Sequence, residues 1–194
     1  MACNCAIYAI YLVSGPRHFA NFTHDKDVRP GSERYALDLG LDDPIEFVQH
    51  GGGSQISDNP LCGGLIEVWH NRVFSILRTI GATGWDCRPV ELKCRDGSVR
   101  RDYSRLILEG REPRLVSVPV VINADFSNAY DPLRVRPTVK DIQNVRIPIP
   151  RYDLWMIEGT HVIGATGRVV EALQAANVVG MRFEPVVIMK PRSR

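Results

Sequence analysis

The chain has 194 residues, of which 44% are hydrophobic and 24% charged, so it can bury a substantial core and has the composition of an ordinary globular protein. Its formal net charge of +2 is too small to indicate nucleic acid as a partner, and no segment approaches the roughly twenty apolar residues that a membrane span needs. The 5 cysteines include no CxxC pair, which argues against a disulfide framework and against a structural metal site. We therefore expect free thiols and a cytoplasmic protein.

The first part of the chain is expected to contain short strands. Residues 6–13 alternate Tyr and Ile and follow no basic residue, which indicates a strand rather than a signal peptide. A short strand is expected at residues 35–39 and another at residues 65–69. Residues 50–59 contain three consecutive glycines without periodicity, so they are expected to form a loop.

A segment that starts at Asn71 recurs without gaps ninety-six positions later, at Gly167. The two copies read NRVFSILRTIGATGWDCRPVEL and GRVVEALQAANVVGMRFEPVVI. Each begins with apolar residues at the spacing of an amphipathic helix, and these predicted stripes are Val73, Ile76, Leu77 and Ile80 in the first copy and Val169, Ala172, Leu173 and Ala176 in the second.

Each helix is expected to end at a residue that tolerates a left-handed backbone, Gly81 in the first copy and Asn177 in the second. After the next glycine the apolar residues alternate, which predicts a strand. The alternation slips at Pro89 and at Pro185, which indicates a bulge or an edge position because proline cannot donate to a ladder.

The rest of the chain continues the strand-rich pattern. Residues 90–94 and 103–108 flank an Asp-Gly turn and predict a hairpin, and residues 115–123 predict another strand. Residues 125–150 contain several prolines and indicate a long connection, followed by strands at residues 153–158 and 161–163.

These elements predict an α+β protein with mixed or mostly antiparallel sheets, few packed helices and an internal β-α-β-like repeat at about residues 65–92 and 161–188. The repeat suggests an N-terminal lobe at residues 1–112 and a C-terminal lobe at residues 113–194, or one continuous domain.

The charges are segregated along the chain, since an acidic stretch without Lys or Arg precedes an arginine-rich one. These stretches are either solvated faces or a surface that docks a protein partner. The candidate partner-binding residues are Asp38, Asp42, Asp43, Glu46, Arg100, Arg101 and Arg105.

Arg72 and Arg168 each open one of the two predicted helices, where a positive charge opposes the helix dipole. We therefore expect each to form a salt bridge to the sheet or to pack its stem, with a partner contact as the alternative.

Two motifs resemble known catalytic signatures. The GATG turn at Gly164–Gly167 is similar to the phosphate-binding turn of dinucleotide-binding proteins, but Val170 occupies the third glycine position and too few residues follow for a doubly wound sheet. The HGGG run at residues 50–53 resembles an oxyanion hole, yet the chain has no G-x-S-x-G elbow. A Cys–His pair formed in space stays open. We expect no catalytic residues, metal ligands or cofactor, with a small nucleotide-binding enzyme as the alternative.

Residues 153–186 resemble the ending of a bacterial family first catalogued as a domain of unknown function and since assigned to immunity proteins of polymorphic toxin systems. That ending has an aspartate-plus-aromatic strand, a helix opened by serine and a basic residue, a glycine, and a phenylalanine-x-proline-valine strand. The serine is replaced here by Gly167 or Thr166. The positions that match are Asp153, Trp155, Arg168, Leu173, Gly180, Phe183, Pro185 and Val186.

The resemblance implies a cytoplasmic, non-enzymatic protein that binds and neutralises a cognate toxin encoded by a neighbouring gene. It brings no catalytic residues, and we expect neither a cofactor nor nucleic acid as a partner. A protein of this kind needs a rigid complementary surface of about 800 Å² rather than a reactive site.

Overall fold

The computed structural model describes residues 7–12, 19–24, 44–62, 66–109, 111–112, 151–157 and 163–186. The strands expected at residues 35–39 and 115–123 and the connection at residues 125–150 lie outside this part of the chain, as do Asp38, Asp42 and Asp43.

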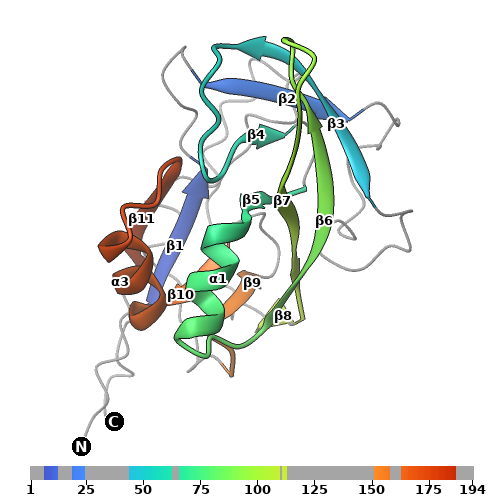
Figure 1. The fold of residues 1–194 in the computed structure, drawn as a ribbon. Helices are drawn as coiled ribbons and strands as arrows, with labels where there is room; N and C mark the ends of the chain where they lie inside the picture. The colour runs from blue at the N-terminus through green and yellow to red at the C-terminus, as the bar shows by residue number, and fades with distance from the viewer. Residues whose placement is uncertain are drawn as a thin grey trace, which may run out of the picture.

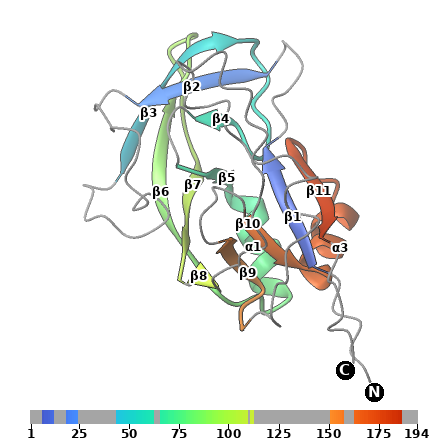
Figure 2. The ribbon, with the colours of Figure 1, turned by 180° about the vertical axis from the view of Figure 1, so that it is seen from behind.

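The described residues form two helices and two sheets (Figure 1 and, from behind, Figure 2). The five-stranded sheet has the order β11-β1-β10-β9-β8, and the six-stranded sheet has the order β4-β2-β3-β6-β7-β5. Pairing is antiparallel except between β2 and β4, β3 and β6, and β8 and β9. The predicted α+β class is confirmed.

The bounds are as follows: for the five-stranded sheet, β1 (Ile7–Leu12), β8 (Arg111–Glu112), β9 (Leu154–Ile157), β10 (Ile163–Thr166) and β11 (Met181–Val186); for the six-stranded sheet, β2 (Ala20–His24), β3 (Ile45–Gly52), β4 (Leu61–Cys62), β5 (Val68–His70), β6 (Trp85–Lys93) and β7 (Val99–Leu108); for the helices, α1 (Asn71–Thr79) and α3 (Gly167–Ala175).

Each helix connects two strands of one sheet, and a third strand separates them. Helix α1 joins β5 to β6, with β7 between these strands, whereas α3 joins β10 to β11, with β1 between them. In both cases the central strand is antiparallel to its neighbours. Strand β1, from the first part of the sequence, therefore lies between two strands from its last part.

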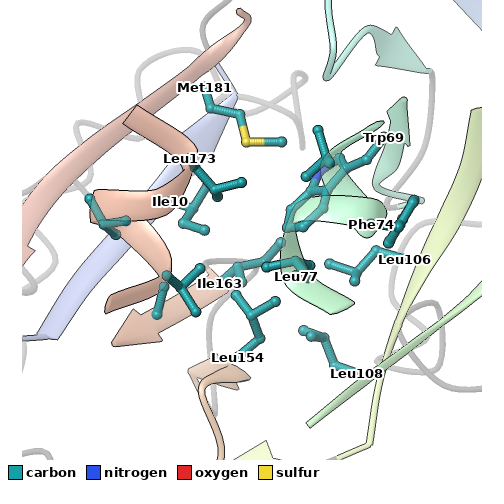
Figure 3. Close-up of a cluster of buried hydrophobic side chains, with 14 residues drawn as sticks. Ile10, Trp69, Phe74, Leu77, Leu106, Leu108, Leu154, Ile163, Leu173 and Met181 are labelled. Carbon is teal, nitrogen blue, oxygen red and sulfur yellow. The ribbon is translucent and has the colours of Figure 1, made fainter. Parts of the chain in front are cut away.

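The main core lies where the two helices meet each other and the sheets (Figure 3). Val73 and Leu77 of α1 and Val169 and Leu173 of α3 are fully buried, as the apolar stripes predict. The most buried face nevertheless differs from the predicted one, because Phe74 and Val170 are buried while the other predicted positions are half-buried. These half-buried positions are Ile76, Ile80, Ala172 and Ala176.

Aromatic stacking accounts for the buried face of α1. The Phe74 ring is 5.8 Å from Trp69 and 5.4 Å from Trp85, measured between ring centroids, with interplanar angles of 29°. Sequence periodicity does not reveal these partners, because they come from the strands on either side of the helix.

The left-handed helix ends and the hairpin are confirmed. Gly81 has φ of 61°, Asn177 is the non-glycine residue with positive φ among those described, at 50°, and Gly97 has φ of 85° between β6 and β7. The predicted start of the loop at residues 50–59 is wrong, because β3 continues to Gly52, where it pairs with β2.

Both prolines lie where the ladder tolerates them. Strand β11, which holds Pro185, is an edge strand of the described sheet. Pro89 lies in β6 one residue before the pairing with β3 begins at Val90, and the register with β7 shifts between Val90 and Leu92. An edge position and a bulge therefore account for the interrupted alternation. No helix in the described part of the chain is long and apolar enough to cross a membrane.

Candidate functional site

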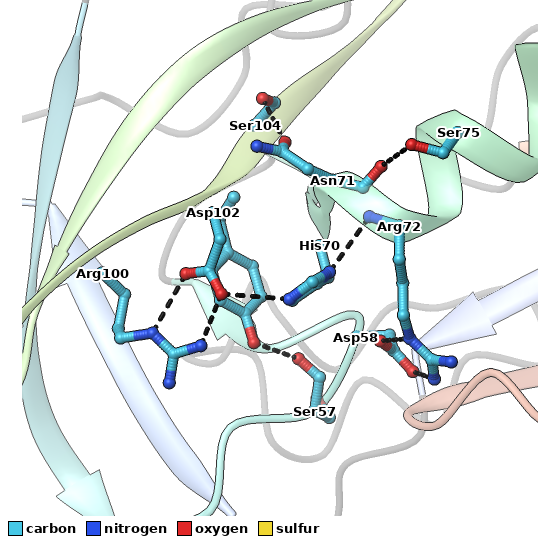
Figure 4. A network of polar contacts seen from close by, with 10 residues as sticks. Ser57, Asp58, His70, Asn71, Arg72, Ser75, Arg100, Asp102 and Ser104 are labelled. Atoms are coloured by element: carbon cyan, nitrogen blue, oxygen red, sulfur yellow. Dashed lines mark hydrogen bonds and ion pairs between the residues drawn. The ribbon is translucent and has the colours of Figure 1, made fainter.

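A polar network surrounds the start of α1, at the junction of β5 and β7 (Figure 4). His70 precedes the helix with an extended backbone, and its Nδ1 accepts a hydrogen bond from the backbone N–H of Arg72 at 3.0 Å. His70 Nε2 lies 3.1 Å from Oδ2 of Asp102. Since Nδ1 acts as an acceptor, Nε2 must carry the proton and donate to Asp102.

Asp102 is held in its ionised form by Arg100. The guanidinium of Arg100 donates to both carboxylate oxygens, at 3.0 and 2.5 Å, and this pairing lowers the pKa of Asp102 below its usual range. Tyr103 packs against the same histidine, since its ring meets the His70 ring edge-on at 4.9 Å between centroids. The Tyr103 hydroxyl donates to the Ser57 carbonyl at 3.1 Å, and burial raises the pKa of this phenol.

A histidine bonded to a carboxylate is an arrangement that acid-base catalysis uses. A general base needs an imidazole lone pair that can accept a proton from substrate, and in His70 that lone pair accepts the helix N–H. This nitrogen is therefore already occupied by the N-terminal cap of α1. The geometry gives His70 a structural task, which is to cap α1 and tie it to β7.

Cys62 and Cys87 lack the lowered pKa of a nucleophilic thiol. Burial raises the pKa of Cys62 well above its ordinary value, and burial likewise raises the pKa of Cys87, although Arg78 lies 3.2 Å from its sulfur. A nucleophilic cysteine needs a lowered pKa, because the thiolate is the reactive form. Among the described residues, no group of three or more His, Cys, Asp or Glu side chains could hold a metal ion.

The GATG turn is not an open loop. Gly164, Ala165 and Thr166 belong to β10, and Gly167 is the first residue of α3. Gly164 pairs with Trp155 of β9, and a Cβ atom at this glycine would lie 2.3 Å from Cε2 of the Trp155 ring. The packing of Trp155 accounts for this glycine, without a phosphate group.

Arg72 and Arg168 connect the two helices to each other. Arg168 donates to Asp153, with Nε 2.6 Å from Oδ1, and its terminal nitrogens reach the carbonyls of Ile80 and Gly81 at the end of α1. Arg72 donates to Asp58, with Nε 2.5 Å from Oδ1, and reaches the carbonyls of Ala176 and Asn177 at the end of α3.

We call these two arrangements the reciprocal clamps, defined as Arg72 with Asp58 and Arg168 with Asp153. Each arginine opposes the dipole of its own helix but favours that of the other, whose C-terminal carbonyls it binds. The helices must therefore run antiparallel. The predicted salt bridges are present, although both carboxylates precede strands or lie in loops rather than within the sheet.

The two aspartates are held in the same way. Asp58 accepts from the backbone N–H of Val179 at 2.7 Å, and Asp153 accepts from that of Thr83 at 3.0 Å. Gly180 and Gly84, the residues that follow, have φ of 91° and 90°, and a Cβ atom at either would collide with the segment that carries the opposing aspartate.

The fold places the candidate partner-binding residues in different environments. Arg105 is 2% exposed, so this part of the prediction is corrected: its side chain lies inside the molecule and cannot form part of a surface patch. Arg100 belongs to the polar network at the start of α1, where its guanidinium donates to Asp102. Glu46 and Arg101, from the acidic and the basic stretch, are exposed, and each pairs with a residue of β6, the strand that lies between β3 and β7.

We call this exposed surface the β3-β6-β7 face. Its polar groups form two ion pairs, with Lys93 Nζ 2.8 Å from Oε2 of Glu46 and Arg101 Nε 2.6 Å from Oε1 of Glu91. Val48 and Val99 flank Lys93 in register, so their side chains complete the face. Neither valine was among the predicted residues, nor were Glu91 and Lys93, although the alternation of residues 45–48 indicates the outward position of Val48.

The chain was compared with protein-family models and with curated proteins, and neither comparison found a match.

Proposed function

We propose that the protein is an immunity protein that binds a cognate bacterial toxin and neutralises it by association, in the cytoplasm of the cell that produces both. The observation that carries the proposal is that both ring nitrogens of His70 form hydrogen bonds within the fold, one to Asp102 and the other to the backbone N–H of Arg72. The group best suited to acid-base chemistry in the described network thus serves structure, which favours a binding protein over an enzyme.

The family resemblance supports the same function. Asp153 and Arg168 form one reciprocal clamp, Trp155 covers Gly164, and Gly180 provides a turn with positive φ. The matched residues therefore hold a scaffold, as expected when related proteins share a framework and vary the surface that recognises each toxin.

A titration distinguishes association from catalysis. The toxin encoded by the neighbouring gene is mixed with increasing amounts of the protein, and the remaining toxin activity is measured. An inhibitor that works by association is expected to abolish activity at a fixed molar ratio, with a heat of binding in calorimetry. Neutralisation by a small fraction of an equivalent would indicate turnover and contradict the proposal, as would the absence of binding.

The variant His70→Asn provides the control. Its side-chain oxygen can still accept the helix N–H, but the residue cannot act as an acid-base catalyst. Unchanged neutralisation by this variant is expected, whereas loss of neutralisation in a folded variant would show that the imidazole itself is required.

A further inference from the structure

We propose that the turn between β6 and β7 is a modification site, at which the backbone of Asp96-Gly97 rearranges to isoaspartate and Ser98 controls the rate. The sequence contains one Asp-Gly pair, and it lies in the loop that joins these two strands (Figure 1). The proposal goes beyond the proposed function and does not depend on it.

The reaction needs no cofactor and no second protein. The backbone nitrogen of Gly97 attacks Cγ of Asp96 and forms a C–N bond, and the carboxyl hydroxyl leaves with the amide proton as water, which gives a cyclic succinimide. Water then adds to one of the two ring carbonyls. Opening at the original backbone carbonyl leaves the chain running through the Asp96 side chain. This product is isoaspartate, which has the same atoms as the original residue.

The space around the turn permits the ring. Asp96 and Gly97 are exposed, and a Cβ atom at Gly97 would meet nothing beyond its chain neighbours within 4 Å. Gly97 has φ of 85°, which glycine adopts without the strain that a side chain would cause. The succinimide can therefore form without a clash with the rest of the fold, and water can reach it.

The attacking nitrogen is held by one hydrogen bond at the loop tip. The N–H of Gly97 donates to the Cys94 carbonyl at 3.0 Å, and the N–H of Cys94 donates to the Ser98 carbonyl at 2.8 Å. Local opening costs least at such exposed tips. The Gly97 nitrogen can therefore be freed while the strand pairing below the turn stays intact.

Ser98 opposes the reaction through the carboxylate. Its backbone N–H and its hydroxyl both donate to Oδ1 of Asp96, at 2.9 and 2.6 Å. This Asx turn holds the carboxylate at Ser98, the residue beyond the attacking nitrogen. The same hydrogen bonds lower the pKa of Asp96. Because loss of water requires the neutral carboxyl group, a lowered pKa leaves less of the reactive form at any pH above it.

Isoaspartate would alter the hairpin beyond residue 96. It adds a methylene group to the backbone of a loop whose ends are fixed by the pairing of Lys93 with Val99. The N–H of Arg95, the preceding residue, donates to Oε1 of Gln49 at 3.0 Å, so the change also affects a contact with β3. We therefore expect the rearranged protein to have a loosened turn.

Peptide mapping of the full chain tests the site. The protein is incubated in mildly acidic buffer and digested, and isoaspartate at residue 96 is quantified by chromatography and mass spectrometry. Ser98→Ala removes the hydroxyl bond and is expected to speed isoaspartate formation several-fold, whereas Ser98→Thr keeps a hydroxyl and should react like the wild-type protein. Asp86, an exposed aspartate of β6 that is followed by Cys87, is the internal control and should stay unchanged.

The same incubation in urea separates the effect of the turn from that of the sequence. Once unfolded, wild type and Ser98→Ala should react alike and faster than the folded wild type, because the Asx turn is absent. If no folded variant formed isoaspartate at residue 96 while the unfolded chain did, the site would be overturned. Equal rates in folded wild type and Ser98→Ala, or a difference that persisted in urea, would overturn the role of Ser98.

Discussion

Gly164 lies against the indole of Trp155, and this contact explains why a glycine stands at this position of the GATG sequence. The glycine is needed because a Cβ atom would overlap the ring, at 2.3 to 2.6 Å from three of its atoms. The absence of a side chain at Gly164 thus leaves room for the indole of Trp155.

Gly164→Ala is expected to destabilise the protein by about 1 to 3 kcal/mol, because the buried Trp155 must move to accept the methyl group. Urea unfolding measures the loss. Gly51→Ala is the control, since the nearest atom to its Cβ would be 3.8 Å away in ordinary contact. Equal stability of both variants would show that Trp155 does not require the glycine.

The lowered pKa of Asp153 makes the free energy of unfolding depend on pH. Burial alone would raise its pKa, but hydrogen bonds from Arg168, Thr83 and Thr166 outweigh burial and lower the pKa to about 2. Because the folded pKa lies below the unfolded one, near 4, the stabilisation is complete above pH 4 and is lost as the pH falls from about 4 to about 2.

The variant Asp153→Asn should therefore lose roughly 2 kcal/mol of unfolding free energy at neutral pH, and its stability should depend less on pH between 4 and 2. Urea unfolding at a series of pH values tests this. A parallel pH dependence in both proteins would mean that other carboxylates control acid unfolding.

Among the elements, helix α1 depends on a histidine cap that the sequence did not indicate. Asn71 is a residue type suited to the capping position, but the structure makes it the first residue of the helix and places His70 before it as the cap. Asn71 instead accepts a hydrogen bond from the Ser104 hydroxyl at 2.7 Å. Helix α3 has Thr166 in the capping position, but the Thr166 hydroxyl donates to Oδ1 of Asp153 at 2.9 Å and makes no hydrogen bond to the helix backbone.

His70→Ala is expected to lower stability by about 1 kcal/mol, through loss of the cap and of the contact with Asp102. His70→Asn should recover part of this loss, because its side chain can accept the Arg72 N–H. Amide exchange in the first turn of α1 reports on the cap directly. Unchanged protection there in the alanine variant would contradict a capping role.

In the whole molecule, the reciprocal clamps join segments about a hundred residues apart. Arg72 binds the end of α3 and Arg168 binds the end of α1, so the antiparallel helices are fastened at both ends. The hydrophobic cluster between them draws on both sheets. We therefore expect the two halves to unfold together.

Arg72→Met and Arg168→Met, alone and combined, test this coupling. Each variant keeps an apolar stem but leaves an aspartate without its partner, and a loss of about 1 to 3 kcal/mol is expected. The double variant should lose less than the sum, by about 0.5 kcal/mol or more, because opening one clamp already frees the helix pair. Strict additivity in urea unfolding would show that the clamps act independently.

Local features were predictable because their causes are local. The periodicity of residues 71–80 and 167–176 specifies helices, Gly81 and Asn177 specify their ends, and the Asp96-Gly97 pair specifies the hairpin. The shift of the buried face toward Phe74 was not predictable, since it depends on two tryptophans from neighbouring strands.

The sequence by itself determined the α+β class, the two helices with their left-handed ends and the hairpin, because hydrophobic spacing and backbone preference act over a few residues. Only the tertiary structure decided that β1 lies between β10 and β11, that Arg105 is buried, and that Glu46 and Arg101 share a face. These features follow from strand pairing between distant segments, where many registers satisfy the same local pattern and the packing of the whole core selects one.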